Sequence, residues 1–169
     1  MIRGSTDSEE EVPRTMRISS LMYFSSFTRL KPVSAAIDPR ELAKVAPELF
    51  VPDVDRAIRF YAGSLGFELL RREEAGGKAT FAVVALGQAI VMLADQGHYA
   101  AMGAALVEPR GRGIDVRFVV PDVDAMYRTC TMSGARIALD IGDRYYGLRD
   151  FIVEDPNGYR LRFASPRSA

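Results

Sequence analysis

Two stretches of the chain are almost identical: Phe50–Asp55 (FVPDVD) and Val119–Asp124 (VVPDVD), which begin 69 positions apart. In each, an apolar run ends at a proline and an Asp-Val-Asp motif follows. The first aspartate of each motif is a good helix N-cap, because its carboxylate can accept backbone N–H groups of the first turn. We expect the aspartates of both motifs to serve in helix capping. The repeat predicts two copies of one structural module.

In each copy, a strand and a helix are expected to precede three further strands. The first helix is expected to start at Asp53 and end at Gly66, and the second to start at Asp122 and end near Gly134. Apolar alternation and Gly-rich turns predict strands at 45–51, 67–71, 80–86, 89–94, 136–139, 149–153 and 159–164.

These elements predict an α+β fold of two βαβββ modules. We place module one at 45–95 and module two at 114–165, joined by a linker at 96–113 that is rich in Ala, Gly and Arg. Residues 1–44 differ in composition from the rest and are predicted to be an N-terminal extension.

The composition excludes several classes of protein. The chain has 169 residues, and its 22 Lys and Arg balance 22 Asp and Glu, so it lacks the basic excess of a nucleic-acid binder. No apolar run approaches the roughly 18 residues that would span a bilayer. Cys130 and His98 are the sole cysteine and histidine of the sequence. These features predict a cytoplasmic protein without disulfides, with Cys130 in the core and His98 exposed in the linker.

Several separated motifs resemble the vicinal oxygen chelate superfamily, and within it the glyoxalase/bleomycin-resistance-like branch. The residues that carry the resemblance are Pro47–Asp53 (PELFVPD), Phe60-Tyr61, Leu65–Phe67 (LGF) and Asp155–Phe163 (DPNGYRLRF). The resemblance covers about residues 45–165. It implies that the two modules form curved mixed sheets with a concave cup for a ligand, that the helices pack on the convex side, and that the protein is a homodimer.

The same resemblance implies where a metal would be held in metal-dependent members. Those positions fall on Ala46 and Asp115 in the first strands, and on Arg162 and a residue near Val91 in the last strands. Alanine and valine cannot ligate a metal, and arginine would place a positive charge beside it. We therefore expect no metal and no other cofactor, and we expect Asp115 to pair with Arg162 instead.

Strand alternation assigns residues to the two faces of each sheet. Core positions are expected at Leu49, Val51, Val116, Phe118, Val120, Leu161 and Phe163. The opposite face is expected to present Glu48, Phe50, Asp115, Arg117, Arg160 and Arg162. Such a face is either a solvated surface with exposed ion pairs or the lining of a polar ligand cavity, and the resemblance favours the cavity.

Tyr145 and Tyr146 precede a predicted strand in a segment that borders the ligand groove in similar proteins. They could stack on a flat ligand; alternatively, one packs inward while the other covers a loop. The predicted ligand-binding set is therefore Glu48, Phe50, Asp115, Arg117, Tyr145, Tyr146 and Arg162.

The resemblance implies two main functional classes. The first is a metal-independent protein that binds a small drug-like molecule and sequesters it, as bleomycin-resistance proteins do. The neutral chain and its cup arginines favour an anionic or zwitterionic aromatic ligand over a cationic one. The alternative is a metal-dependent enzyme of the glyoxalase or dioxygenase type. A third possibility is a degenerate module that serves only in dimerisation or regulation.

Overall fold

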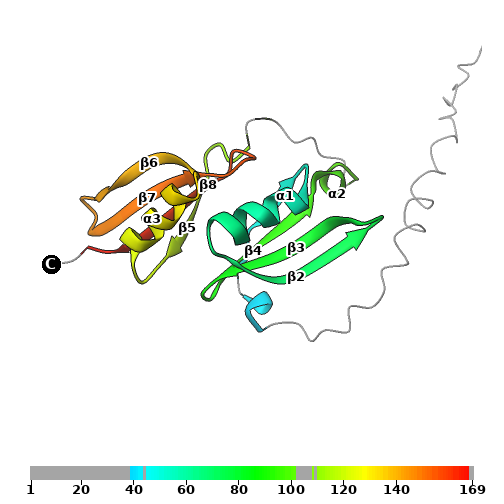
Figure 1. The fold of residues 1–169 in the computed structure, drawn as a ribbon, viewed down its shortest axis with the longest axis horizontal. Coiled ribbons are helices and arrows are strands. Elements are labelled where there is room, and N and C mark those ends of the chain that lie inside the picture. The colour runs from blue at the N-terminus through cyan, green and yellow to red at the C-terminus, as the bar shows by residue number, and fades with distance from the viewer. Residues whose placement is uncertain (1–38, 44, 102–107, 109, 168–169) are drawn as a thin grey trace, which may run out of the picture. The chain divides into compact units, whose positions relative to one another are not determined.

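The fold consists of two four-stranded mixed sheets, each with a helix of its own (Figure 1). The computed structural model describes residues 39–43, 45–101, 108 and 110–167. The first sheet has the strand order β1-β4-β3-β2 and the second β5-β8-β7-β6, so each module repeats the same topology. In both sheets the first strand runs parallel to the last, and the other pairs are antiparallel. The predicted α+β fold of two βαβββ modules is confirmed.

Module one follows a 3-10 turn, η1 (Pro39–Leu42). Helix α1 (Val54–Ile58) continues as a π-helical segment, η2 (Arg59–Ser64), whose last turn closes with the Leu65 N–H donating to the Phe60 carbonyl oxygen. The strands of this module are β1 (Glu48–Val51), β2 (Glu68–Ala75), β3 (Lys78–Leu86) and β4 (Ala89–Asp95).

Module two is built around helix α3 (Val123–Met132). Its strands are β5 (Asp115–Val119), β6 (Arg136–Asp143), β7 (Leu148–Glu154) and β8 (Arg160–Pro166). Between the modules, the predicted linker begins with a short helix, α2 (Gln96–Ala101), on which His98 is exposed as expected.

The edge strands β2 and β6 run several residues beyond their predicted ends. Apart from the half-buried Ile141 and Gly142, the additional residues are polar or exposed, so the apolar alternation that marks a half-buried strand weakens before the strand ends. Backbone pairing with the neighbouring strand continues to Ala75 and Asp143 even so.

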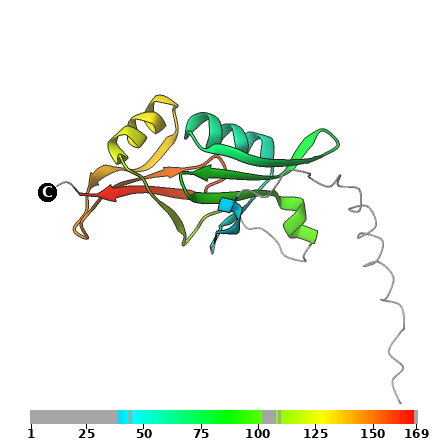
Figure 2. The same cartoon turned by 90° about the horizontal axis from the view of Figure 1, so that it is seen from below.

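In each module the helix covers one face of the sheet (Figure 2), and the buried core lies between them. Of the predicted core positions, Val116 is half-buried against this core and the other six are at most 7% exposed. The buried rings of Phe67 and Phe118 meet edge to face at 5.3 Å and join the cores of the two modules. The Tyr61 hydroxyl also crosses between modules and donates to Asp155 at 3.2 Å.

The aspartates of the repeated motif divide into two roles, which corrects the prediction that all of them cap. Asp53 and Asp122 do cap their helices, each accepting a backbone N–H at 2.8 Å. Asp55 and Asp124 instead bind arginines of the sheet, Arg72 and Arg149, each at 2.9 Å. These ion pairs connect the start of each helix to a strand. The spacing of residues within the helix does not predict them, because the partner arginine lies elsewhere in the chain.

Cys130 is fully buried on the core side of α3, and burial raises the pKa of its thiol to about 12. The predicted core thiol is confirmed, since a thiol with such a pKa forms almost no thiolate at neutral pH. Within the described part of the chain, no helix has the length and apolar character needed to cross a membrane.

Candidate functional site

The face of the second sheet that lies opposite α3, which we call the cup face of module two, carries aligned rows of side chains. Strand register places residues of all four strands in each row. The first row alternates in charge and contains Arg136, Glu154, Arg160 and Asp115. The second row contains Leu139, Ile152, Arg162 and Arg117, and the third contains Gly142, Asp150, Ala164 and Val119.

Arg162 lies at the centre of an ion network on this face. Its Nη2 donates to Asp115 Oδ2 at 2.8 Å, and its Nη1 donates to Asp150 Oδ2 at 3.0 Å. The other oxygen of Asp115 accepts from Arg160 Nε at 2.8 Å. The predicted pairing of Asp115 with Arg162 is confirmed, and the arginine is shared between two carboxylates.

Asp150 anchors the network from beneath, because its side chain is fully buried. It accepts hydrogen bonds from Arg144 Nε at 2.7 Å, from Arg162 and from the Tyr146 hydroxyl. Burial by itself raises the pKa of Asp150, but these three hydrogen bonds outweigh it, so the pKa lies below its ordinary value. The hydrogen bonds from Arg162 and Arg160 likewise outweigh the effect of burial on Asp115 and lower its pKa.

Two predicted ligand-binding residues lie side by side on the exposed part of this face. Tyr146 is 42% exposed, and the guanidinium of Arg117 lies 6.0 Å from the centre of its ring. Arg117 is exposed and makes no hydrogen bond or ion pair to another residue within the described segments. Tyr145 is fully exposed and contacts the Tyr146 ring edge to face at 5.1 Å.

The structure thus brings together Asp115, Arg117, Tyr146 and Arg162, with Tyr145 at the margin. Glu48 and Phe50 do not join this group, because they lie on β1 in the other sheet. Glu48 is exposed and Phe50 half-buried. Their sheet face carries a buried apolar cluster, Val83, Ala85 and Ile90. Its charged group is a different one, in which Arg71 of β2 pairs with Glu41 at 2.9 Å and with Glu73 at 3.8 Å.

Sequence reasoning missed Asp150 and Arg144. A signal for Asp150 was available, since it alternates with Ile152 and Glu154 along β7 and therefore faces away from the helix. Arg144 lies in the β6–β7 turn and reaches back over the sheet to the carboxylate and the backbone carbonyl oxygen of Asp150. No local pattern predicts that return, because it depends on the turn geometry.

Residues 42–163 match the sequence model of the Glyoxalase/Bleomycin resistance protein/Dioxygenase superfamily. The chain belongs to this superfamily. Its fold matches the crystal structure of TioX from Micromonospora sp. ML1 with a TM-score of 0.61. The two sequences are 30% identical, and the match covers 74% of this chain and 99% of that one. An uncharacterized protein of Mycobacterium tuberculosis (strain ATCC 25618 / H37Rv) is 28% identical over 72% of this chain and 74% of that protein.

A superfamily structure from Nocardioides shares the fold at 20% identity, covering 88% of this chain and 93% of that one with a TM-score of 0.60.

The metal positions implied for the superfamily do not fit a metal in this chain. The register corrects one of them: Val91 is buried on the helix side, whereas Met92 pairs with Glu48, just as Arg162 pairs with Arg117 in module two. The four positions therefore hold Ala46, Met92, Asp115 and Arg162. Of the four, only Asp115 could ligate a metal through oxygen, and both of its carboxylate oxygens already accept hydrogen bonds from arginines.

The lowered pKa of Asp150 predicts an acid-sensitive contribution to stability. A carboxylate with a depressed pKa in the folded state stabilises the fold above its unfolded pKa of about 3.9, and this contribution is lost as the pH falls below that value. We expect the wild type to be more stable than Asp150→Asn at pH 7, with the difference shrinking below about pH 4. Urea unfolding of both proteins from pH 7 to 2.5 measures this difference, and a difference independent of pH would contradict the assignment.

Proposed function

We propose that this protein binds a small anionic or zwitterionic aromatic molecule on the cup face of module two, without a metal. The observation that carries the proposal is the exposed pair of Arg117 and Tyr146 beside an ion network that is already internally paired. Arg117 supplies a charge for an anionic group, and the ring of Tyr146 supplies an aromatic surface.

The network beneath this pair supports a binding role because it holds the face in one arrangement. Tyr146 donates its hydroxyl proton to the buried Asp150, so its ring is fixed at the surface. That hydrogen bond raises the pKa of Tyr146 and keeps the phenol neutral. A ligand therefore meets an aromatic group that is already positioned, which reduces the entropy lost on binding.

Two fluorescent probes with the same aromatic skeleton test this proposal. Anilinonaphthalene sulfonate carries a negative charge, whereas its analogue N-phenylnaphthylamine is neutral. We expect the sulfonate to bind wild type and to bind Arg117→Ala at least about tenfold more weakly, since one charge-assisted hydrogen bond contributes roughly 1.5–3 kcal/mol. The affinity of the neutral probe should change less than about twofold. Fluorescence titration measures both affinities.

Arg128→Ala is the matched control, because Arg128 is an exposed arginine on α3, away from the cup face. It removes the same charge and should leave both probes unaffected. Equal affinity of the sulfonate for the Arg117→Ala and wild-type proteins would overturn the proposal.

The alternative, a metal-dependent enzyme, is tested by metal content. The protein is incubated with Mn²⁺, Fe²⁺, Ni²⁺ and Zn²⁺, desalted and examined by elemental mass spectrometry. The proposal expects less than about a tenth of an equivalent of each metal per chain, whereas close to one equivalent would favour the enzyme.

Sequestration of a drug-like ligand, and hence antibiotic resistance, is a further part of the proposal. So are a homodimer and a cytoplasmic location, the latter supported by a single, buried cysteine that has no disulfide partner within the chain. Sedimentation equilibrium tests the dimer, and a mass close to the 18.6 kDa of one chain would contradict it.

A further inference from the structure

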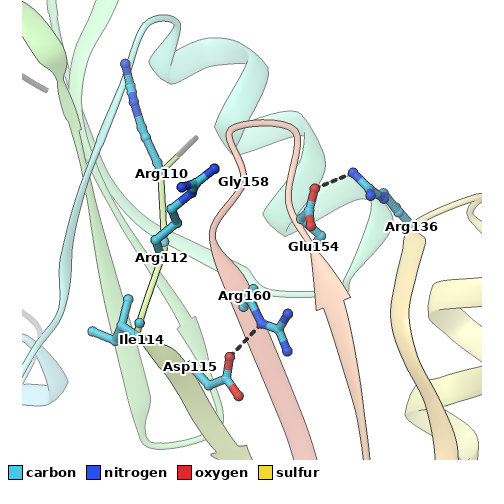
Figure 3. A pocket seen from close by; sticks show the side chains of 10 residues that line it. Arg110, Arg112, Ile114, Asp115, Arg136, Glu154, Gly158 and Arg160 are labelled. Atoms are coloured by element: carbon cyan, nitrogen blue, oxygen red, sulfur yellow. Dashed lines mark hydrogen bonds and ion pairs between the residues drawn. The ribbon is translucent and has the colours of Figure 1, made fainter. Parts of the chain in front are cut away.

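A separate pocket of about 720 Å³ lies where the turn at 110–113 meets the first row of the cup face (Figure 3). Four arginines and two carboxylates line it: Arg110, Arg112, Arg136, Arg160, Asp115 and Glu154. The lining is therefore positive overall in a chain whose formal net charge is zero. Its volume falls in the range of small-molecule sites, which is roughly 300–1,000 Å³.

Two features hold the turn at 110–113 in place: hydrogen bonds from the buried Arg110, and a close backbone contact between Gly111 and Gly158. Arg110 is buried and donates to the Phe50 carbonyl oxygen and to Gln96. Gly111 packs so closely on the β7–β8 turn that a Cβ there would lie 2.5 Å from the Gly158 carbonyl oxygen. The backbone that positions Arg112 is therefore anchored to the sheet.

The arginines of the pocket differ in how fully they are engaged. Arg160 donates its Nε to Asp115 and Arg136 donates its Nη1 to Glu154, so each keeps further N–H groups for another acceptor. Arg112 is exposed and has no hydrogen-bond or ion-pair partner among the residues that the structure describes. Figure 3 shows Arg112 extending toward Gly158, whereas Arg110 points away from the other arginines.

We propose that this pocket binds the phosphate group of a small phosphorylated molecule, with Arg112 as its principal contact and Arg160 and Arg136 as supporting donors. The three arginines line the pocket from the turn, from β8 and from β6, so each can supply a donor from a different element. That arrangement suits a tetrahedral anion with oxygens in several directions, and guanidinium groups bind phosphate through charge-assisted hydrogen bonds. The two sites share Asp115, but neither Arg117 nor Tyr146 lines this pocket, so the two proposals are tested by different residues.

The test is a titration of ¹⁵N-labelled full-length protein with sodium pyrophosphate, followed by NMR at constant ionic strength set with NaCl. We expect saturable shifts at residues 112–115 and 158–160, with a dissociation constant below about 1 mM. Arg112→Ala should weaken binding about tenfold or more, because a charge-assisted contact is lost. Arg128→Ala should bind as wild type does, within about twofold.

Because Arg112 is exposed, the variant is expected to fold, and its thermal unfolding without pyrophosphate checks this. If Arg112→Ala does not fold, Arg112→Gln retains the length of the side chain and removes the charge. Three outcomes would overturn the proposal: shifts that stay linear to about 10 mM pyrophosphate, equal affinities of the Arg112 and Arg128 variants, or shifts confined to the surroundings of Arg117 and Tyr146. The last outcome would place the anion at the other site and leave the proposed function standing.

Discussion

Asp150→Ala is expected to lower the free energy of unfolding by about 3 kcal/mol, because it removes the buried partner of two arginines. Asp150 is fully buried, while the side chains of Arg144 and Arg162 are only 24% and 16% exposed. Without the carboxylate, both guanidinium groups would stay near the sheet with unsatisfied donors, and the Tyr146 hydroxyl would lose its acceptor. Urea unfolding monitored by circular dichroism measures the change.

Asp143→Ala is the control for this prediction. Like Asp150, Asp143 pairs with an arginine, in this case Arg149 at 3.1 Å, but the side chain of Asp143 is 50% exposed. Exposed pairs contribute little, so we expect a loss below about 1 kcal/mol. Equal losses in the Asp143 and Asp150 variants would mean that burial of the network does not matter. The Asp150 variant should also lose the fixed position of Tyr146, which is visible as sharper NMR resonances from that ring.

Gly111→Ala is expected to lower the free energy of unfolding by a similar amount, about 3 kcal/mol, for two additive reasons. The residue has a φ of +72°, a conformation that costs an L side chain roughly 1–2 kcal/mol. A Cβ would in addition lie 2.5 Å from the Gly158 carbonyl oxygen and 2.8 Å from the Tyr159 Cα. Both neighbours are backbone atoms, so the turn must move away from the sheet.

Gly113→Ala separates these two contributions. Gly113 lies in the same turn at a φ of +78°, but nothing lies within 4 Å of its Cβ position. It should cost only the roughly 1–2 kcal/mol of the backbone conformation. The difference between the two variants, obtained from urea unfolding, is the cost of the close approach. A Gly111 variant as stable as the Gly113 variant would show that the turn does not pack tightly on Gly158.

Much of the fold could be predicted from the sequence because it is encoded locally. The repeated FVPDVD and VVPDVD stretches, the N-caps Asp53 and Asp122 and the alternation of core residues are all patterns that neighbouring residues share. Strand ends were less predictable: β2 and β6 extend through mostly polar residues, where pairing with a neighbouring strand continues after the clear apolar alternation has ended.

The candidate site was predictable only where strand alternation governs it. Asp115, Arg117 and Arg162 share a face because residues two apart on a strand point the same way, and parallel pairing aligns β5 with β8. The residue near Val91 shows the limit of such counting. A shift of one position, from Val91 to Met92, exchanges the helix side for the cup face.

The sequence by itself therefore determined the two modules, their helix starts, their core and the acidic and basic character of the cup face. Only the tertiary structure decided how those charges are arranged. Asp150 binds Arg162 from a neighbouring strand and Arg144 from a turn, and the turn that carries Arg112 lies against the sheet because Gly111 packs on Gly158. These contacts depend on register, on turn conformation and on packing between segments distant in the chain, none of which a local pattern of residues records.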